Sequence, residues 1–576
     1  MDIARRDLFK AGAVIGGIAA LGGLAGCAPA KTSLGESGEA TNATAKTLPA
    51  YLTEEDFANS IVEIDEITDF TDEKTFDVVV IGAGISGVPA VMTALEEGAT
   101  VCCLQKQDVV AANGSGSSGI VLEACTGIGA ENWKRMLRET TSFRADNALL
   151  DFYASHSGEA VRWLGKTAFK AGFDGGSATT PFSFPDGTAA LKVSNVFRTN
   201  NDAMTAIAEV AQAQGAEFFF STPAVQLVKD DSGRVTGAIG KTADGSYIKF
   251  NATKAVIIAA GDYENNESMV ARFAADTVPF RHVQSQRTGD GILMAALAGG
   301  HMVLGAHPCQ LHDMHTSPMP VQGTPFLAAS MNGKRFMDES IGMTNWWQVL
   351  RRQTNVDYVG NFCRIFDSTF PEFLAKTAPK MPAPTAEEFE PYMPNGSNYN
   401  GNGGMFCADT LEDLADQMGI PKDELIKSVE RYNELCEKGF DEDFGKDAQY
   451  LAPIAEAPFW GILQEVTCCA IDAGIAVDGN YQVIDDDANP IPGLFSVGSG
   501  AGNLCGYINW PLEYTGSIAP MYKAGIFGGL SNGHCVTAGR YATIYALTGD
   551  YKPASPTEWN EDVAAFYEGK GAPAPW

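Results

Sequence analysis

The sequence predicts an α/β protein organised around a doubly wound nucleotide-binding domain. The stretch FDVVVIGAGISGVPAVMTALEEGATVCCLQK, residues 76–106, reads as an apolar strand, a glycine turn, an amphipathic helix and a second strand. The chain has 576 residues and is 45% hydrophobic, which is typical of a globular protein with more than one domain. A βαβ unit of this kind belongs to a parallel sheet with helices on its faces, and this gives the fold class.

Three glycines give the turn of this unit its expected function. Gly82 permits the tight turn, Gly84 lets the backbone approach a pyrophosphate, and Gly87 lets the helix pack closely on the strand. The N-terminus of the helix then faces the phosphates. The second strand ends in Gln105, where an acid normally binds the adenosine ribose, and the amide oxygen of Gln105 can still accept a hydroxyl proton.

Composition narrows the classes of partner. The chain carries 71 acidic and 40 basic residues, a formal net charge of -31, which repels phosphate backbones and argues against a nucleic-acid partner. High solubility alone also explains this charge. The 12 cysteines include no CxxC pair and no CxxCH motif, so neither a zinc ribbon nor a covalently attached haem is predicted, and the scattered spacing leaves an iron–sulfur cluster as an open alternative without a motif of its own.

The N-terminus predicts export. Residues 1–27 contain Arg5 and Arg6 followed by a glycine- and alanine-rich apolar stretch that is too short to span a bilayer comfortably. RRDLFK resembles the twin-arginine export motif, and LAGC resembles a lipobox with Cys27 as the lipidated residue. We therefore expect a protein held on the outer face of the cytoplasmic membrane by a lipid anchor only, with residues 28–73 as a tether.

Later motifs extend the pattern. AVIIAAGDYENN from Ala255, TGDGILMAALAGG from Thr288, NGKRF at 332–336 and GLFSVGSGAGN from Gly493 stand in the order and spacing of one family. Across about residues 75–535 the chain resembles the fumarate reductase and flavocytochrome c flavoprotein superfamily. The resemblance implies FAD, bound by a discontinuous doubly wound domain (74–262 and 449–576), and an inserted α+β capping and substrate domain (263–448).

The glycine turn and the resemblance together give a set of expected FAD-binding residues. For Asp290 a helix cap is the alternative reading. The set is Gly82, Gly84, Ser86, Gly87, Gln105, Lys106, Asn113, Ser118, Gly119, Gly261, Asp290, Gly498, Gly516 and Ser517.

Local patterns predict several elements. NDAMTAIAEVAQAQG, residues 201–215, predicts a helix that ends at Gly215, followed by an apolar strand and a hairpin at DDSG. Residues 408–439 predict two helices separated at Pro421.

The motifs that carry substrate chemistry in fumarate reductases are altered here. In that family FAD gives a hydride, and an arginine four residues after the GKRFxNE element gives the proton. GKRFMDE ends at Glu339, so the arginine position is Met343. Met343, Trp346 and Trp347 form either an apolar pocket wall or ordinary core of the capping domain. A second carboxylate-binding arginine of the family falls on Glu513, which would repel a dicarboxylate.

Other residues are candidates for the substrate pocket. SIAP after Gly516 resembles the SIGP of ketosteroid dehydrogenases in the same superfamily, and the preceding segment supplies Tyr507, Trp510, Glu513 and Tyr514. Tyr514 or a glutamic acid at 513 could polarise a carbonyl or protonate carbon. His307 matches a family histidine that touches substrate. Structural packing is the alternative for each of them.

Three functions are consistent with these residues. The first is an exported FAD-dependent reductase of an activated C=C bond in an aromatic, enoate or steroid-like enone acceptor, used in anaerobic respiration or detoxification. Its electrons would come from a separate quinol-linked cytochrome or flavin carrier. The second is a dehydrogenase that introduces a C=C bond beside a ketone, and the third is a binding protein without catalysis.

Overall fold

The computed structural model describes residues 48–567, with gaps at 115, 142, 174–176, 184–189, 198–199, 284–285, 314–315, 319–320, 342–345, 347–348, 351–358, 378–381, 400, 402 and 505–528. Within these ranges, the helices are all too short or too polar to cross a lipid bilayer.

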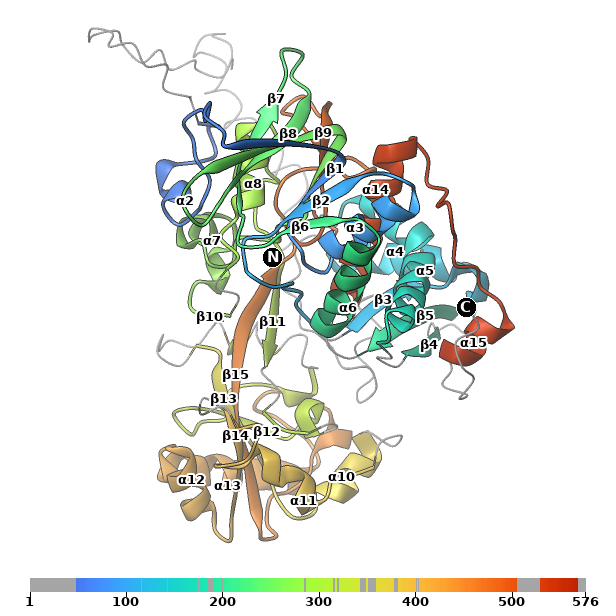
Figure 1. The fold of residues 1–576 in the computed structure, drawn as a ribbon. Coiled ribbons are helices and arrows are strands. Elements are labelled where there is room, and N and C mark those ends of the chain that lie inside the picture. Colours follow the sequence, from blue (N-terminus) through green and yellow to red (C-terminus); the bar gives the residue numbers. More distant parts are fainter. Residues whose placement is uncertain are drawn as a thin grey trace, which may run out of the picture. The chain divides into compact units, whose positions relative to one another are not determined.

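An eight-stranded sheet forms the nucleotide-binding part (Figure 1). Its parallel strands are, in spatial order, β17 (Pro490–Ser496), β9 (Tyr247–Ile258), β1 (Asp72–Ile81), β2 (Val101–Leu104) and β6 (Glu217–Phe219). Three strands join antiparallel: β16 (Gln482–Ile484), β8 (Val235–Lys241) and β7 (Ala224–Lys229). Residues 78–81 and 101–104 are continuous apolar runs and are buried, as expected where both faces of a sheet are covered. The predicted α/β class is confirmed.

Helices cover this sheet. The crossover helix α3 (Gly87–Glu96) packs against α14 (Leu530–Thr548) and α6 (Asn200–Ala213), and α14 packs against α5 (Asn147–Lys170). The buried Arg540 of α14 joins three of these helices, because it pairs with Glu96 of α3 at 3.0 Å and with Glu159 of α5 at 2.9 Å. The remaining elements of this part are β3 (Gly116–Ile120), α4 (Gly129–Thr140), β4 (Ser177–Ser183), β5 (Ala190–Phe197), α7 (Glu267–Phe273), α8 (Asp290–Leu297) and α15 (Glu561–Tyr567).

A six-stranded sheet is built around the long strand β15 (Phe459–Ile471). β15 pairs with β10 (Arg281–His282), β11 (Cys309–Asp313), β13 (Asn361–Phe366) and β14 (Gly404–Ala408), and β12 (Leu327–Ser330) pairs with β13. Its helices are α10 (Phe370–Thr377), α11 (Ala386–Phe389), α12 (Leu411–Met418) and α13 (Lys422–Lys438).

The GKRFMDE element forms a buried charge cluster beside this sheet. Arg335 donates two hydrogen bonds to Glu339, both at 2.9 Å, and two more to Asp441, at 2.8 and 3.1 Å. Lys446 lies 3.2 Å from Glu339, and both side chains are fully buried. Because Glu339 is fully buried and is enclosed by these cations and by the backbone N–H of Ala328, its carboxylate stabilises the fold.

The structure differs from the predicted tether over residues 48–73, which are folded. Helix α2 (Glu54–Ala58) lies here, and Leu52, Phe57 and Val62 are buried. We call residues 48–66 the N-terminal strap. Its three buried apolar side chains are five positions apart, which matches neither a helical nor a strand period, so no local pattern reveals their burial.

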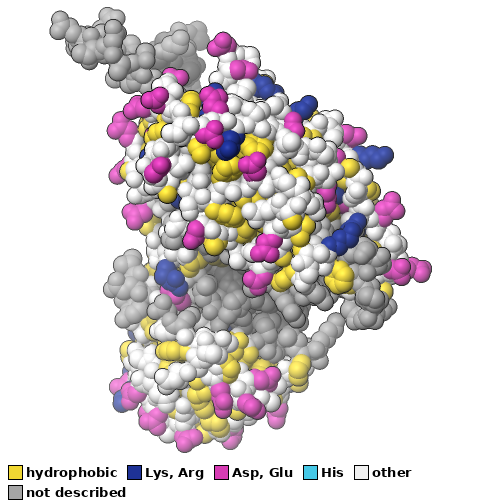
Figure 2. All heavy atoms as spheres, in the orientation of Figure 1, with side chains coloured by type: hydrophobic (Ala, Val, Ile, Leu, Met, Phe, Trp, Pro, Cys, Tyr) yellow, Lys and Arg dark blue, Asp and Glu magenta, His cyan; other side chains and the backbone are white. Residues whose placement is uncertain are grey.

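The predicted local elements are confirmed. Helix α6 ends at Ala213, before Gly215 with its φ of +106°. β7 and β8 form the hairpin around residues 230–233, and α12 and α13 are separated at Pro421. Figure 2 shows acidic side chains scattered over the visible face, as the net charge of -31 leads one to expect.

Candidate cofactor site

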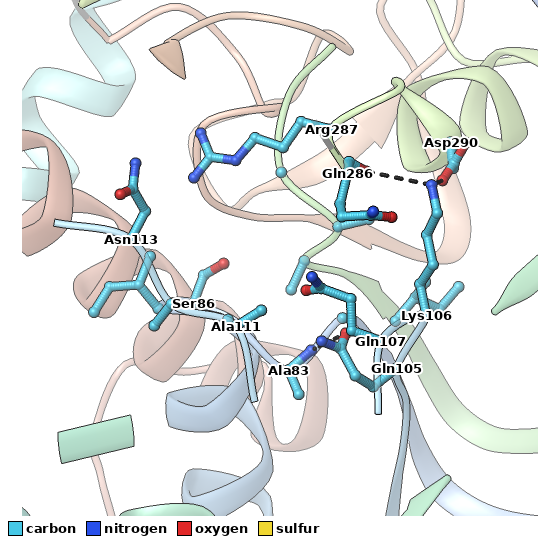
Figure 3. Close-up of a pocket in the computed structure, with 18 of the residues that line it drawn as sticks. Ala83, Ser86, Gln105, Lys106, Gln107, Ala111, Asn113, Gln286, Arg287 and Asp290 are labelled. Atoms are coloured by element: carbon cyan, nitrogen blue, oxygen red, sulfur yellow. Dashed lines mark hydrogen bonds and ion pairs between the residues drawn. The ribbon is translucent and has the colours of Figure 1, made fainter. Parts of the chain in front are cut away.

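A cavity of about 440 Å³ lies where three parallel strands end (Figure 3). Its walls are residues 81–86 after β1, 105–107 after β2 and 259–261 after β9, together with 109–113. Ligands of open α/β sheets bind outside these carboxyl ends. The size falls in the range of roughly 300–1,000 Å³ that is usual for cofactor sites.

The glycine turn at one wall has the conformation that the sequence predicts. Gly82 has a φ of +107°, and a Cβ on it would stand 2.5 Å from the carbonyl oxygen of Ala259. A Cβ on Gly87 would overlap the carbonyl oxygen of Gly82, so α3 reaches the turn only with glycine at this position. Gly84 and Ser86 line the cavity, at the N-terminus of α3, where backbone N–H groups lack partners inside the helix.

Gln105 braces this turn. Its side-chain oxygen accepts a hydrogen bond from the N–H of Ala83 at 3.1 Å, and its amide nitrogen donates to the carbonyl of Val109 at 2.9 Å. The carbonyl oxygen of an amide has a second lone pair, which leaves room for the predicted ribose contact. An acid at this position would lack the N–H that holds Val109.

An ion pair marks the same end of the cavity. Lys106 Nζ lies 2.9 Å from Asp290 Oδ2 and also donates to Thr288 Oγ1 at 3.0 Å. Asp290 is the first residue of α8 and follows the N-cap residue, which is Gly289, so Asp290 is not the N-cap that the alternative predicted. Its Oδ1 accepts from Ser60 Oγ at 2.8 Å and from the N–H of Ile61 at 3.2 Å, so Asp290 also holds the N-terminal strap, and Ile61 lines the cavity.

We expect an Asp290→Ala variant to release the strap. Exchange of the Ile61 amide should accelerate at least about tenfold, because a hydrogen bond to a charged acceptor contributes about 1.5–3 kcal/mol. Hydrogen exchange read by mass spectrometry checks this, with Asp69→Ala, an exposed position just outside the strap, as the control. Equal exchange of Ile61 in wild type and D290A would show that the strap is held by its apolar side chains alone.

The opposite end of the cavity is lined by Asn113 and Arg287. Asn113 donates to the carbonyl of Cys469 at 3.3 Å. Arg287 Nη1 donates to Asp262 Oδ2 at 2.8 Å, and Asp262 is fully buried behind it. Burial alone would lower the pKa of Arg287, but the Asp262 carboxylate outweighs burial and raises this pKa above its ordinary value. Figure 3 shows the guanidinium directed toward Asn113 and away from Asp290.

A buried acid lies near this end. Asp472 accepts hydrogen bonds from Gln310 Nε2 at 2.7 Å and from Ser531 Oγ at 3.1 Å. Burial, with a contribution from Asp262, raises the pKa of Asp472 to about 6.

Three expected residues serve packing around the cavity. A Cβ on Gly119 would overlap the carbonyl oxygen of Ser157, so β3 approaches α5 only with glycine there. Ser118 is buried on β3, and its N–H donates to the carbonyl of Gly529 at 2.9 Å. Gly498 has a φ of +85°, and its Cα faces Ser86. Gly261 does line the cavity, as do Gly82, Gly84, Ser86, Gln105, Lys106, Asn113 and Asp290.

His307 is held within the protein, which differs from the predicted pocket role. Its Nδ1 accepts from the hydroxyl of Tyr263 at 2.6 Å, and its Nε2 donates to the carbonyl of Val303 at 2.7 Å. The ring is fully buried and stacks on Phe273. Burial lowers the pKa of His307 to about 4, so the ring stays neutral near pH 7 with both nitrogens engaged.

Trp346 lies in the core, which agrees with the second of its two predicted readings. It is buried against Phe362, with ring centroids 5.8 Å apart, and the guanidinium of Arg364 lies over its ring. The other predicted residues of the substrate site, of the last glycine turn and of the lipid anchor lie outside the described residues: Cys27, Met343, Trp347, Tyr507, Trp510, Glu513, Tyr514, Gly516 and Ser517.

Arg287 is the main lining residue that sequence reasoning missed. It directly precedes the TGDG motif, and a basic residue between a glutamine and a glycine turn gives no sign of burial. Its partner Asp262 lies 25 positions earlier. The fold alone brings the two together.

The cavity fits FAD. The glycine turn and the N-terminus of α3 suit a pyrophosphate, and the polar end at Gln105 and Lys106 suits the adenosine ribose. Partly exposed donors of Arg287 face the remaining space. These residues would hold the adenosine, the phosphates and the flavin in that order along the cavity.

Comparison with known proteins establishes the family. Residues 77–509, about three quarters of the chain, match the family of the FAD binding domain, so the protein belongs to this family of flavoproteins. The predicted resemblance to fumarate reductase-like flavoproteins is confirmed, and the protein is an FAD-dependent oxidoreductase acting on CH–CH bonds.

Individual relatives cover most of the chain. It is 26% identical over 473 residues to the vinyl phenol reductase of Lactiplantibacillus plantarum, covering 75% of this chain and 91% of that protein. It is 25% identical over 543 residues to the digoxin reductase of Eggerthella lenta, covering 86% and 90%. The open conformation of a flavocytochrome c3 fumarate reductase shares the fold, with a TM-score of 0.61, 21% identity and coverage of 83% of this chain and 79% of that one.

Proposed function

We propose that the protein is an exported reductase that passes a hydride from FAD to an activated C=C bond of an acceptor other than a dicarboxylate. An aromatic compound, an enoate or a steroid-like enone would be such an acceptor. When bound, FAD supplies the hydride from N5. The protein has to orient the acceptor, exclude water and deliver one proton to the carbon that does not receive the hydride.

The observation that carries the proposal is an FAD cavity in a chain with Met343 at the position of the proton-donating arginine of fumarate reductases. A methionine cannot give a proton. Glu513, at the position of a carboxylate-binding arginine, would repel a dicarboxylate acceptor. The two relatives described above are named as reductases of vinyl phenol and of digoxin, neither of which is a dicarboxylate.

The described part of the cavity agrees with this choice. Its basic lining residues are Lys106 and Arg287, and each is already paired with a carboxylate, Asp290 or Asp262. The charge of each cation is therefore already balanced by one carboxylate of the protein, so the described lining offers no uncompensated positive charge for an acceptor with two carboxylates. We assign the proton to Tyr514 where Glu513 is ionised and repels dicarboxylates, or to Glu513 where it is protonated and uncharged, with Met343, Tyr507 and Trp510 as the residues of an apolar pocket.

The test is anaerobic reoxidation of the dithionite-reduced holoenzyme, followed by flavin absorbance. We expect rapid reoxidation by a vinyl phenol, a cinnamate or a steroid enone and slow reoxidation by fumarate. Tyr514→Phe or Glu513→Gln should slow reoxidation of the flavin by the active acceptor about 10²-fold or more if the replaced residue is the acid, with the FAD content unchanged. Rapid reoxidation by fumarate would contradict the assignment of Met343 and Glu513.

The dehydrogenase is the second candidate, because SIAP at residues 517–520 resembles the SIGP of ketosteroid dehydrogenases. In that direction a tyrosinate would take the α proton of a ketone while FAD accepts the hydride. Faster turnover with a dye and a saturated ketone than with reduced viologen and the enone would favour it. No reaction with any compound of the panel would favour a binding protein.

Export and anchoring complete the proposal. The Arg5–Arg6 pair and Cys27 support a folded, FAD-loaded protein that is carried across the membrane and lipidated. The electron donor would then be a quinol-linked cytochrome or a flavin carrier on that side. A Cys27→Ala variant that stays in the membrane fraction would contradict the anchor.

A further inference from the structure

The FAD cavity is charged at both ends, and the two ends differ in kind. At the end next to β2, Lys106 and Asp290 form an ion pair with the N-terminal strap closed behind it. The acid or amide that ends the second strand of this fold faces the adenosine ribose, so this end takes the adenosine. The opposite end, with Asn113 and Arg287, is left for the flavin (Figure 3).

The geometry of Arg287 leaves hydrogen-bond donors facing the cavity. Nη1 is occupied by Asp262 at 2.8 Å and by the carbonyl of Cys469 at 3.4 Å. Within the part of the chain that the structure describes, Nε and Nη2 have no hydrogen-bond partner. The side chain is 19% exposed whereas Asp262 is 0% exposed, and Arg287 extends across Gly261 in the cavity wall.

We propose that Arg287, fixed by Asp262, is a cation that binds the flavin end of FAD and stabilises its reduced form. FAD that takes up two electrons and one proton gains one negative charge. A guanidinium beside it favours this state over the oxidised one. Asp262 is a positioning residue, because it is fully buried and is not among the residues that line the cavity.

The surrounding acids do not reverse the sign of this effect. Glu264 and Asp472 are buried near the same end, at 2% and 7% exposure, and neither is among the residues that line the cavity; Asp472 accepts hydrogen bonds from Gln310 and Ser531. Coulomb energy falls with distance, and Arg287 is the charged group of this cluster that lines the cavity. We therefore expect the guanidinium to set the field at the flavin.

The test is the two-electron midpoint potential of the holoenzyme for wild type, Arg287→Gln and Lys106→Gln. R287Q should bind reduced FAD about tenfold less well relative to oxidised FAD, which is a fall of about 30 mV for a two-electron couple. K106Q removes the same charge from the adenosine end of the same cavity. It should weaken FAD binding without changing the potential. An unchanged potential in R287Q, or equal shifts in R287Q and K106Q, would overturn the assignment.

Two further variants test the proposal if R287Q does not fold. Arg287→Lys keeps the charge, so its midpoint potential should be closer to that of wild type than the potential of R287Q is. Asp262→Asn removes the opposing carboxylate and should raise the midpoint potential. A midpoint potential that falls in R287K and does not rise in D262N would show that the charge of Arg287 does not set the potential. No substrate enters these measurements, so their failure is distinct from failure of the proposed reductase activity.

Discussion

A Gly87→Ala variant should lose FAD. A Cβ at this position would overlap the carbonyl oxygen of Gly82, so α3 has to move away from the glycine turn. Overpacking of a close backbone contact costs about 1–3 kcal/mol or more. The N-terminus of α3 would then be displaced from the pyrophosphate. At the upper end of that range the affinity for FAD falls about a hundredfold.

The measurement is the FAD content of purified protein, followed by titration of the apoprotein with FAD. Gly479→Ala is the matched control, since the atom that a Cβ there would meet is the Cβ of Ala148 at 3.2 Å, which needs a shift of only a few tenths of an ångström, whereas a Cβ on Gly87 would stand 1.8 Å from a backbone oxygen. G479A should retain FAD as wild type does. Full FAD content in G87A would mean that the turn can relax without moving the helix.

A Glu339→Gln variant should unfold the sheet around β15 more easily. Glu339 is fully buried between Arg335 and Lys446, and the amide would leave two buried cations with one carboxylate, Asp441. Removing one partner of a buried ion pair costs about 3–5 kcal/mol. Urea unfolding followed by tryptophan fluorescence measures this loss. The matched control is Glu434→Gln, which removes an exposed partner of Arg431 and should change the free energy of unfolding little.

The same carboxylate predicts a pH dependence. Burial alone would raise the pKa of Glu339, but Lys446 and Arg335 outweigh burial and hold it below its ordinary value of 4.5. The folded state therefore binds the proton less tightly than the unfolded state. The stabilisation is complete above about pH 4.5 and is lost as the pH falls through the folded pKa. The difference between wild type and E339Q should shrink over this acidic range, and a difference that is constant with pH would contradict a charged Glu339.

Much of the fold could be predicted because its signals are local. The glycine turn, α6 with its terminal Gly215 and the pair of helices around Pro421 all follow from spacing within one element. The role of the GKRFMDE element could be predicted only in part. Its residues suggest an active-site motif, yet Arg335 and Glu339 are held by Asp441 and Lys446, more than 100 positions away along the chain.

The parts that could not be predicted depend on contacts between distant segments. The N-terminal strap has no periodicity, and its burial depends on Asp290 and on α7. The side chain of Gln105 accepts a hydrogen bond from the backbone of Ala83, and the presence of glutamine where an acid is usual does not reveal this contact. His307 matches a family position but is held inside the protein, because the hydroxyl of Tyr263 and the carbonyl of Val303 together satisfy both of its nitrogens.

The long-range contacts of α14 also determine when the protein can acquire its cofactor during synthesis. Arg540 of α14 pairs with Glu96, 444 positions earlier. In the same way, Ser60 of the strap can donate its hydrogen bond to Asp290 only after 230 further residues have been synthesised. The helix that presents the pyrophosphate site is therefore fastened only after residue 540 has left the ribosome. A nascent chain that ends before residue 530 would have the glycine turn but lack the helix that secures it. FAD should therefore bind only after α14 has been synthesised, at a stage when the chain either closes around it or remains incompletely folded.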